Sequence, residues 1–514
     1  MKKNVLIILI ATLSVQLLKA QPVTFQQVDS ILSIYFCTHQ TNDGGYITGG
    51  VVHDPSAYFV PGCLLKLDSN GNKVWSKKFS SDSLNIYVEF SEQTSDGGYI
   101  LAGELKDTAS AHENYVIKTD ASGNMVWSTV FGNGTFDFVK QVHQTSDGGY
   151  IVVGYVNSGN QSFLVKLNSS GIVSWSKKYN FSVNDQAYSV KQTNDGGFIL
   201  LGITQDSIDR IYLIKADGSG NTQWAKTYSG ADIGASSVEI TNDGGFLLTG
   251  YIEYKILLFK TDNNGNLLWS KKYGNPLGWG NHAVQTNDGG YIITGALNVS
   301  SCFLAKTDSL GNYSWAKTYR DTLGNSTQGC FVNQTSDNGY IVSALTNINF
   351  NMLTNTPLYL IKTDANGNSG CNEKTLLLTD STVAITVAPH SVTVTPGFNT
   401  YNIIITESNC NPGVTQLCNS TGIDEISNTG SDILIYPNPT TSQFTITLND
   451  ASTGSAYNAE IKIINLLGEC VLQPPPLRGG REGLVDIGAL SKGIYFVEVI
   501  TKDKQVMRSK IVKQ

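Results

Sequence analysis

Residues 192–198 read Gln-Thr-Asn-Asp-Gly-Gly-Phe, one of seven closely similar phrases along the chain. A second phrase follows each copy, with the pattern Lys-Thr/Leu-Asp-x-x-Gly-Asn-x-x-Trp and small variations. The aspartates of the first phrase are Asp43, Asp96, Asp147, Asp195, Asp243, Asp288 and Asp337, spaced 45 to 53 residues apart. Because the two phrases keep a constant phase, the repeating unit is the whole stretch between successive copies.

Each unit contains four short segments with the composition of β-strands. In the fifth unit they cover residues 236–241, 246–250, 256–261 and 267–273, all rich in β-branched and aromatic residues. Asn-Asp-Gly-Gly separates the first two segments, and Asp-x-x-Gly-Asn separates the last two. Glycine supplies the positive φ of a tight turn, and Asp or Asn side chains bond to the nearby backbone. Four antiparallel strands per unit predict one blade of a β-propeller.

The seven units predict an all-β, seven-bladed β-propeller, in which the first and last blades must be joined. The seventh unit has Cys371 where the other units have tryptophan, so its outer strand must come from elsewhere. Phe25 lies 18 residues before Asp43, close to the spacing of 19 to 22 residues between each tryptophan and the next repeat aspartate. We therefore predict that residues 23–28 complete the last blade and remove an open sheet edge. Residues 375–379 are the alternative closing strand.

Six of the seven tryptophans occupy one place in the repeat: Trp75, Trp127, Trp175, Trp224, Trp269 and Trp315. One large aromatic side chain per blade can fill the wedge between neighbouring blades, whereas the alternative is an aromatic platform for carbohydrate. Sixfold repetition at one place favours packing. Trp279 lies outside the pattern, between two glycines, and is a candidate for an exposed ligand contact.

The composition excludes several classes of protein. The chain has 514 residues, of which 40% are hydrophobic, so it can bury a large core and is not globally disordered. Its 35 basic residues are outnumbered by 42 acidic ones, and the formal net charge is -7. This balance provides no basic face for nucleic acid. We expect a monomer.

The second phrase resembles the Asp-box of sialidase-type propellers, in which an aspartate turn joins the third and fourth strands and a tryptophan follows. The resemblance covers eight residues per unit, Asp-x-x-Gly-Asn-x-x-Trp, and the Asp-box family includes proteins that are not enzymes. Sialidases hold the substrate carboxylate with several arginines, because arginine binds carboxylates bidentately. The repeats contain only Arg210 and Arg320, which argues against a sialidase.

Other catalytic and metal-binding patterns do not occur in the sequence. Glycoside hydrolysis needs two carboxylates about 5–10 Å apart, whereas the repeat aspartates are assigned to turns. No Gly-x-Ser-x-Gly elbow, His-x-x-x-His pair or Cys-x-x-Cys pair is present. Residues 262–266 offer oxygen ligands but lack the distant glutamate of a calcium loop. We therefore predict no catalytic residues, no metal and no cofactor.

One variable position in the repeat is the best candidate for ligand contact. It lies four residues before each repeat aspartate, between neighbours that are nearly uniform, and holds His39, Glu92, His143, Lys191, Glu239, Val284 and Asn333. If the first strand of each blade lines the central channel, His39, Glu92, His143, Lys191 and Glu239 face a ligand there. The alternative is ordinary tolerance of substitution at a wet channel wall.

The two ends of the chain differ from the repeats. Residues 1–20 begin with Lys2 and Lys3, continue with a short apolar run and end at Ala20, which predicts a secretory signal peptide. Residues 373–428 carry strand-like runs without the repeat and predict a β-rich connector. Cys410 and Cys418 flank Asn-Pro-Gly, which suits a loop disulfide, and Cys371 is an alternative partner for either.

Residues 429–514 predict a separate small β-sandwich. They contain Tyr-Pro-Asn-Pro at 436–439, Ile-Ile-Asn-Leu-Leu-Gly at 463–468, Leu-Ser-Lys-Gly-Ile-Tyr at 490–495 and the terminal Lys-Ile-Val-Lys-Gln. This order of elements closely resembles the C-terminal sorting domain of type IX secretion. The residues that carry the resemblance are Tyr436, Pro437, Asn438, Pro439, Gly468, Gly493, Tyr495, Lys510 and Val512. Residues 474–481 depart from the pattern as a loop insertion.

The resemblance implies an export route: passage to the periplasm, recognition of the tail by the type IX secretion machinery, and release or attachment to surface polysaccharide. The domains predicted are a signal peptide over 1–20, a propeller over 21–372, a connector over 373–428 and the sorting domain over 429–514. The function predicted is a secreted or cell-surface scaffold that binds glycan or protein without catalysis. The alternative is an extracellular polysaccharide hydrolase.

Overall fold

The computed structural model describes residues 23–513, apart from a set of short segments. The segments outside the description are 34–36, 53–57, 108–111, 133–135, 157–160, 183, 207, 275–276, 299–300, 321–325, 347–356, 402, 411–413, 421–432, 437–439, 449–459, 466–469, 476–481 and 501–505. The predicted signal peptide lies outside the described residues. The chain divides into two compact units, residues 1–422 and 423–514, which are described separately.

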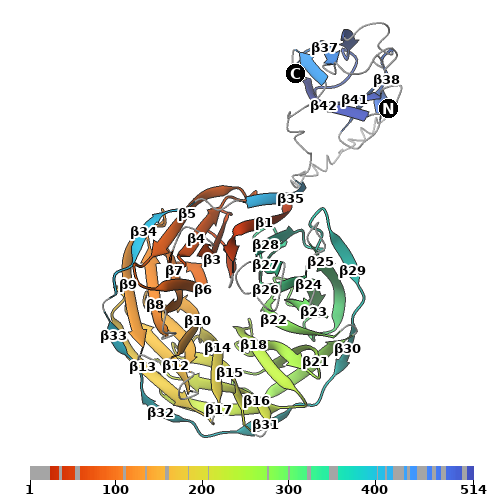
Figure 1. Ribbon diagram of the computed structural model, residues 1–514. Coiled ribbons are helices and arrows are strands. Elements are labelled where there is room, and N and C mark those ends of the chain that lie inside the picture. The colour runs from red at the N-terminus through yellow and green to blue at the C-terminus, as the bar shows by residue number, and fades with distance from the viewer. Residues whose placement is uncertain are drawn as a thin grey trace, which may run out of the picture. The chain divides into compact units, whose positions relative to one another are not determined.

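The first unit is a ring of antiparallel sheets around a central axis (Figure 1). Its described strands pair into seven groups of four, and the prediction of an all-β propeller is confirmed. The first group is β2 (Thr38–Gln40), β3 (Tyr46–Val52), β4 (Gly62–Leu67) and β5 (Lys73–Ser80). The second is β6 (Asn85–Gln93), β7 (Tyr99–Lys106), β8 (His112–Thr119) and β9 (Met125–Gly132). The third is β10 (Asp137–Gln144), β11 (Tyr150–Val156), β12 (Gln161–Leu167) and β13 (Val173–Asn180).

The remaining groups continue round the ring in chain order. The fourth is β14 (Asp185–Gln192), β15 (Phe198–Gln205), β16 (Asp209–Ala216) and β17 (Thr222–Ser229). The fifth is β18 (Ile233–Ile240), β19 (Phe246–Ile252), β20 (Lys255–Thr261) and β21 (Leu267–Gly274). The sixth is β22 (Gly278–Gln285), β23 (Tyr291–Leu297), β24 (Ser301–Thr307) and β25 (Tyr313–Tyr319). The seventh is β26 (Thr327–Gln334), β27 (Tyr340–Thr346), β28 (Pro357–Thr363) and β1 (Thr24–Ser33).

The repeat aspartate organises the first turn of each blade. In the fourth blade, Asp195 Oδ1 accepts hydrogen bonds from Thr193 Oγ1 at 2.5 Å and from the Gly197 amide at 3.0 Å. Gly196 adopts the left-handed region, with φ +78°, which a residue with a side chain adopts only at a cost. The same pattern in each repeat explains why the phrase is nearly invariant.

The repeat lysine forms an ion pair with the repeat aspartate of its own blade. Lys215 Nζ lies 2.9 Å from Asp195 Oδ2 and donates to the Ala216 carbonyl at 3.2 Å. The six matching ion pairs are Lys66–Asp43, Lys118–Asp96, Lys166–Asp147, Lys260–Asp243, Lys306–Asp288 and Lys362–Asp337. Each lysine is buried, so the pair ties the third strand to the turn between the first two strands.

The N-terminal strand closes the ring. β1 pairs with β28 of the seventh blade, and Phe25 stands opposite Lys362. The first and last blades are thereby joined into one sheet. The alternative closing segment is occupied elsewhere, because β29 (Glu373–Leu376) pairs with β25 of the sixth blade.

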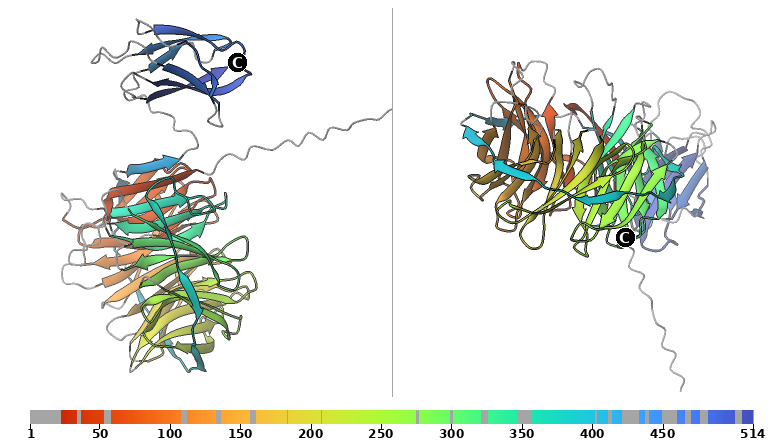
Figure 2. Two further views of the ribbon diagram at one scale, coloured as in Figure 1. Left: turned by 90° about the vertical axis from the view of Figure 1, so that its right-hand side faces the viewer. Right: turned by 90° about the horizontal axis from the view of Figure 1, so that it is seen from below.

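Residues 373–420, expected to form a connector, run round the outside of the ring as a belt (Figures 1 and 2). Each belt strand adds to the outer strand of one blade, and the belt visits the blades in reverse chain order. Its strands are β29, β30 (Thr379–Thr382), β31 (Thr386–Pro389), β32 (Thr393–Pro396), β33 (Asn399–Tyr401), β34 (Thr406–Asn409) and β35 (Val414–Ser420). They cover the outer edges of seven blades, which would otherwise present unpaired backbone groups.

The hydrophobic core is divided among the blade interfaces. Each repeat tryptophan is half-buried and contacts the first aromatic residue of the next blade's second strand. Trp75, for example, lies 5.5 Å from Tyr99 between ring centroids in an edge-to-face arrangement. The other pairs are Trp127–Tyr150, Trp175–Phe198, Trp224–Phe246, Trp269–Tyr291 and Trp315–Tyr340. These contacts run from blade to blade and hold neighbouring sheets together.

The second unit contains two small sheets that enclose a core of its own. One sheet has the order β36 (Ile433–Tyr436), β37 (Gln443–Leu448) and β40 (Glu482–Asp486). The other has the order β39 (Cys470–Leu472), β38 (Glu460–Ile464), β41 (Gly493–Ile500) and β42 (Val506–Lys513). Buried residues of both sheets, including Phe444, Ile463 and Val497, form the core between them.

Candidate binding site at the centre of the ring

The innermost strands of six blades share an irregularity that shapes the centre of the ring. In each of β6, β10, β14, β18, β22 and β26, the pairing register shifts by one residue, which marks a β-bulge. The extra residue always lies seven positions before the repeat aspartate. The six bulge residues are Glu89, Lys140, Tyr188, Ser236, Asn281 and Cys330.

A glycine on the second strand makes room for this bulge. In the fifth blade, a Cβ added at Gly250 would collide with the Gly234 carbonyl and with the Cα of Ala235 on the bulged strand. The same contact between a second-strand glycine and the bulged strand occurs at Gly103, Gly154 and Gly295. The glycine therefore allows a close approach between backbones, which keeps the bulge at one height in several blades.

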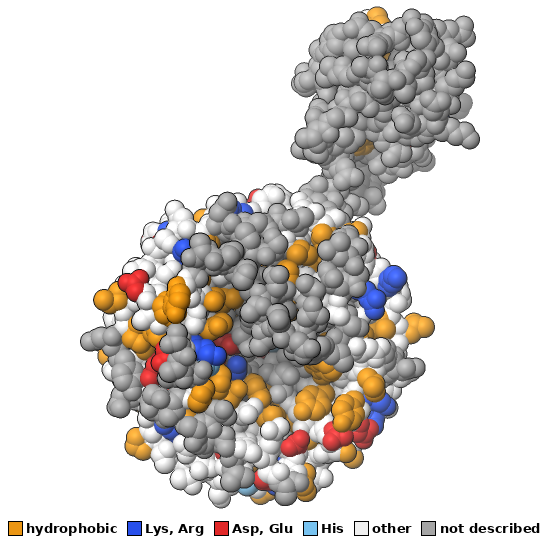
Figure 3. Space-filling view, viewed as in Figure 1, with side chains coloured by type: hydrophobic (Ala, Val, Ile, Leu, Met, Phe, Trp, Pro, Cys, Tyr) orange, Lys and Arg blue, Asp and Glu red, His pale blue; other side chains and the backbone are white. Residues whose placement is uncertain are grey.

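All six bulge residues line one cavity of about 370 Å³ at the centre of the ring. Figure 3 shows the ring hollowed at its centre on the face viewed there, with hydrophobic, basic and acidic side chains beside the hollow. Small-molecule sites usually have volumes of about 300–1,000 Å³, so the cavity has the size of a small ligand site. The six residues differ in size, charge and polarity, although the backbone that presents them repeats.

One side of the cavity combines an ion pair with aromatic rings. Lys140 Nζ lies 3.6 Å from Glu89 Oε2, and it also lies 5.8 Å from the ring centroids of Phe138 and Tyr155. These two rings stack on each other, and the ring of Tyr188 approaches Tyr155 edge-on at 6.2 Å. Burial raises the pKa of the Glu89 carboxyl, and the Lys140 ammonium opposes that rise. The acidic and basic groups that line the cavity here face each other.

The rest of the lining consists of amides, hydroxyls and aromatic rings. Gln141, Ser237, Asn281 and Gln328 contribute polar groups. Some of these groups are fixed by the scaffold: Gln141 Oε1 accepts from the Val190 amide at 3.0 Å, and Asn281 Nδ2 donates to a carbonyl of the next blade at 2.7 Å. The other lining residues are Cys37, Phe90, Ser236, His282, Cys330, Phe331 and Leu345. Polar groups held in place by the scaffold suit selective recognition of a small polar ligand.

The sequence-predicted channel residues lie on the same innermost strands, near their other end. They interact with one another across the blade interfaces. His143 Nδ1 lies 2.8 Å from Glu92 Oε2, and Lys191 Nζ lies 2.8 Å from Glu239 Oε1. His39 Nδ1 lies 3.1 Å from the side-chain amide of Asn333, which links the first and last blades. These residues are not among those that line the cavity.

Burial and ion pairing determine the charges of these residues on the innermost strands. Burial would raise the pKa of the Glu92 carboxyl, but His143 and His39 outweigh it, and the net shift is downward. The pKa of Glu239 falls to about 2, because the charge of Lys191 and the contact with His282 outweigh the effect of burial. Burial lowers the pKa of His39 to about 3 and also lowers that of His282. His39 and His282 are therefore neutral at pH 7.

Within the described structure, Nε2 of His39 and Nε2 of His143 have no hydrogen-bond partner, while Nε2 of His282 lies 3.4 Å from Glu239 Oε1. The three histidine rings also contact Phe90 or Phe331, and His282 stacks on Phe331 with ring centroids 3.7 Å apart. Among the described residues, no group of three His, Cys, Asp or Glu side chains has the geometry of a metal site. Of the three histidines, His282 lines the cavity, whereas His39 and His143 lie outside its lining.

Trp279, the tryptophan outside the repeat, lies on β22 and is half-buried. It stands two residues before the bulge residue Asn281 and pairs with Ala296. It is not among the residues that line the central cavity. The predicted residues therefore lie on the innermost strands, and the cavity is lined by the six bulge residues together with neighbouring side chains.

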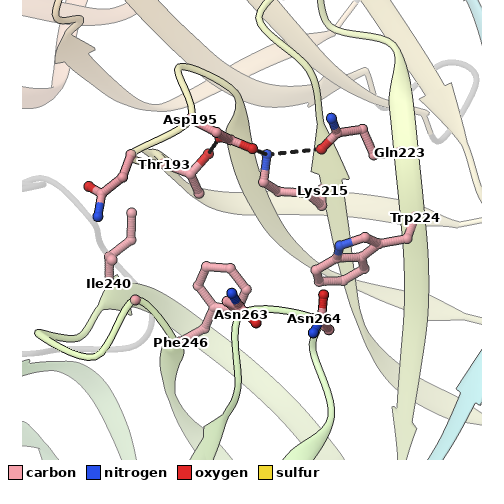
Figure 4. Close-up of a pocket in the computed structure, with 11 residues that line it drawn as sticks. Thr193, Asp195, Lys215, Gln223, Trp224, Ile240, Phe246, Asn263 and Asn264 are labelled. Carbon is pink, nitrogen blue, oxygen red and sulfur yellow. Dashed lines mark hydrogen bonds and ion pairs between the residues drawn. The ribbon is translucent and has the colours of Figure 1, made fainter.

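A second type of pocket lies between neighbouring blades (Figure 4). The pocket drawn there, of about 620 Å³, lies between the fourth and fifth blades, with Asp195, Lys215 and Trp224 facing Phe246 and Asn264. A pocket of about 520 Å³ lies between the sixth and seventh blades. It is lined by the corresponding residues Asp288, Lys306, Trp315, Tyr340 and Asn366. Because these pockets consist mainly of repeated residues that build the ring, they offer much the same chemistry at both interfaces.

The residues that carry the resemblance to a sorting domain are only partly described. Tyr495 is buried in the tail core, and its hydroxyl donates to the Ser491 carbonyl at 2.8 Å. Gly493 begins β41, Tyr436 ends β36, and Lys510 and Val512 lie on β42. Pro437, Asn438, Pro439 and Gly468 lie outside the described residues. Lys513, which belongs to the same terminal motif, is buried and donates to the Ile487 carbonyl at 2.7 Å.

Comparison with known proteins identifies the tail. Residues 434–514 match the family described as "Secretion system C-terminal sorting domain". The resemblance predicted from the sequence is confirmed, and this domain marks proteins exported by type IX secretion to the cell surface or the extracellular space. No helix in the described part of the chain combines the length and hydrophobicity needed to span a bilayer. A search of curated protein sequences finds no match.

The solved structures that comparison finds are distant in sequence. The quinohemoprotein alcohol dehydrogenase from Comamonas testosteroni is 10% identical, with a TM-score of 0.41, over 67% of this chain and 76% of that chain. Sqt1 from Chaetomium thermophilum is 10% identical, with a TM-score of 0.42, over 66% of this chain and 99% of that chain. A luciferin-regenerating enzyme is 11% identical, with a TM-score of 0.35, over 56% of this chain and 97% of that chain.

Proposed function

We propose that this exported protein is a binding protein whose central cavity holds a neutral, hydroxyl-rich ligand, namely a sugar unit of a glycan. The observation that carries the proposal is the set of six bulge residues around one cavity. The same backbone geometry recurs in six blades, but each blade contributes a different side chain to the cavity. The backbone is therefore uniform, whereas the chemistry of the lining differs from blade to blade.

The chemistry of the lining favours a sugar over a charged ligand. Burial raises the pKa of the Glu89 carboxyl to about 8, and the buried His282 is neutral, so neither group brings a full charge to the lining at pH 7. Amides and hydroxyls can donate to and accept from sugar hydroxyls, while Tyr188, Phe90 and Phe331 offer ring surfaces to the apolar face of a sugar. A protein ligand that inserts a polar side chain into the cavity is the second candidate.

The alternative function, hydrolysis of polysaccharide, makes a different demand on the same cavity. Hydrolysis needs two carboxyl groups about 5–10 Å apart on either side of the scissile bond. Lys140 is the charged group in contact with Glu89, and among the described residues no second carboxyl group lines the cavity. This arrangement supports binding without catalysis.

A glycan array followed by ligand-detected NMR with the purified full chain tests the proposal. We expect binding of at least one glycan, and we expect Tyr188→Ala and Ser236→Trp to weaken it at least tenfold, by removing a ring and by filling the cavity. Val126→Ala is the matched control, because Val126 is 61% exposed on the outer strand β9. Unchanged affinity in both cavity variants would place the ligand elsewhere, and release of shortened glycans would favour the hydrolase.

A further inference from the structure

Two cysteines from distant parts of the chain meet at the end of the belt. Cys63 lies on β4 of the first blade and is fully buried. Cys410 directly follows the belt strand β34 and is partly buried. Their Sγ atoms are 2.9 Å apart, although the residues are 347 positions apart in the sequence. This separation exceeds the ~2.04 Å length of a disulfide bond by only about 1 Å.

The backbone around Cys410 is fixed to the blade that carries Cys63. β34 pairs with β5, with Asn409 opposite Lys77, and β5 pairs with β4, with Cys63 opposite Lys78. The hydroxyl of Ser76 donates to the Cys410 carbonyl at 2.7 Å. The two thiols are therefore brought together by strand pairing on both sides and by a side-chain hydrogen bond.

We propose that Cys63 and Cys410 form a disulfide that fastens the end of the belt to the first blade when the chain meets a disulfide-bearing oxidant. The export route supplies the setting, because disulfides form and persist outside the cytoplasm. Cys371, immediately before the belt, is already disulfide-bonded. The new bond gives the belt a covalent attachment near its other end.

The reaction proceeds by thiol–disulfide exchange. The Cys410 thiol loses its proton and attacks one sulfur of the oxidant disulfide, which forms a mixed disulfide and expels the first thiol of the oxidant. The Cys63 thiol loses its proton and attacks Sγ of Cys410, which forms the Cys63–Cys410 bond and expels the second thiol. Two protons and two electrons leave the protein, and the oxidant disulfide is reduced to two thiols.

The surroundings suit Cys410 as the first nucleophile. It is the more exposed of the two residues, so the oxidant reaches it first. The contact with Cys63 lowers its pKa, burial opposes this effect, and the positive charges of Lys73 and Lys78 contribute further lowering. By contrast, burial raises the pKa of the Cys37 and Cys330 thiols to about 12, so these thiols resist oxidation.

The direct test counts thiols in the full chain after refolding in a glutathione disulfide buffer. The protein is denatured without reductant, alkylated, and analysed by intact mass and by peptide mapping. We expect four labelled cysteines, which are Cys37, Cys302, Cys330 and Cys470, and a peptide containing Cys63 linked to one containing Cys410. Labelling of six cysteines, with Cys63 and Cys410 among them, would overturn the proposal.

A second test measures whether the bond fastens the belt. We expect Cys410→Ser to increase the rate of proteolytic cleavage within residues 399–410 by roughly tenfold, because the belt end then opens without breaking a covalent bond. The same protein treated with dithiothreitol is not a substitute, since reductant also removes the bond at Cys371. Cys470→Ser is the matched control, because Cys470 is exposed in the tail. Equal cleavage rates in Cys410→Ser and wild type would contradict a fastening role.

Discussion

Phe25 stands opposite Lys362 in the pairing of β1 with β28, the same register in which Trp75 stands opposite Lys66 within the first blade. Phe25 also contacts Tyr46 of the first blade edge-on, with ring centroids 5.8 Å apart, as each repeat tryptophan contacts the next blade. The N-terminal strand thus takes the place of a blade's outer strand, with Phe25 at the position of the repeat tryptophan. The ring closes because a distant segment carries the aromatic residue that the seventh repeat lacks.

Replacement of Phe25 by alanine should therefore weaken the closure of the ring. Phe25 is fully buried, so Phe25→Ala should lower the free energy of unfolding by about 3–5 kcal/mol. Phe25→Trp should be tolerated better, because it restores the residue of the repeat. Chemical denaturation measures both effects, and Phe136→Ala, at a side chain that is 42% exposed, is the control. Equal stability of Phe25→Ala and the control would contradict closure through this contact.

The glycine in the second turn of each blade should be required for contact with the previous blade. A Cβ at Gly265 would approach the Trp224 ring to within 2.7 Å, while Gly244 has a similar positive φ and no atom within 4 Å of such a Cβ. Both substitutions by alanine carry the cost of the left-handed backbone, of about 1–2 kcal/mol. Gly265→Ala should cost about 1–3 kcal/mol more than Gly244→Ala, through overpacking against the tryptophan. Thermal melts of the two variants measure the difference, and equal melting temperatures would contradict the packing role of Trp224.

The belt should stabilise the ring through its buried side chains. Ile385 is 9% exposed and belongs to the core between the fourth and fifth blades, whereas Leu377 is 80% exposed. Ile385→Ala should lower the free energy of unfolding by about 2–4 kcal/mol, and Leu377→Ala should leave it nearly unchanged. Hydrogen exchange of the outer strands β17 and β21 should rise in Ile385→Ala alone. A belt that contributes no packing would give two indistinguishable variants.

The seven lysine–aspartate pairs should make stability depend on pH in the acid range. At Asp43, burial would raise the carboxyl pKa, but the Thr41 hydroxyl, the Lys66 ammonium and the Gly45 amide lower it to about 2. The pKa in the folded state is thus below the ordinary value of about 3.9. Such a group stabilises the fold fully above the unfolded pKa, and this contribution disappears as the pH falls through the folded pKa.

Five further repeat aspartates show the same lowering to about 2, namely Asp96, Asp147, Asp195, Asp243 and Asp288. The melting temperature should therefore change little between pH 7 and pH 5 and fall steeply between about pH 4 and pH 2. Calorimetry over this range measures it. Since these carboxylates are largely exposed, salt should reduce the effect. A melting temperature that stays constant down to pH 2 would contradict the role of the pairs.

Much of the ring could be predicted from the sequence because its turns and blade contacts repeat. Asp195 and Lys215 recur because each blade needs the same turn and the same ion pair. Their spacing along the sequence therefore predicts where each blade lies. The belt has no such phrase, since its strands contribute only about four residues each to an existing sheet. Its one visible regularity is Thr-Val-Ala-Pro at 386–389 followed by Thr-Val-Thr-Pro at 393–396, where successive blades receive one strand each.

The residues that line the cavity could not be predicted from the alternation of side chains between the two faces of a strand. A bulge inserts one residue, so the face of each side chain beyond it changes relative to a regular strand. Counting from Asp243, the sequence pattern pointed to Glu239, whereas the bulge places Ser236 at the cavity. The signal that could have found it is Gly250, the strand glycine opposite the bulge, because an interior glycine in a strand often marks a bulge.

A crystal structure of the full chain, soaked with a glycan selected by the array, shows whether the bulge residues form the binding site. We expect density for a sugar in the central cavity, within hydrogen-bonding distance of Asn281 or Gln141 and in contact with the ring of Tyr188. Density for the sugar at another site, such as the pockets between blades beside Trp224 or Trp315, with the central cavity holding only water, would contradict it.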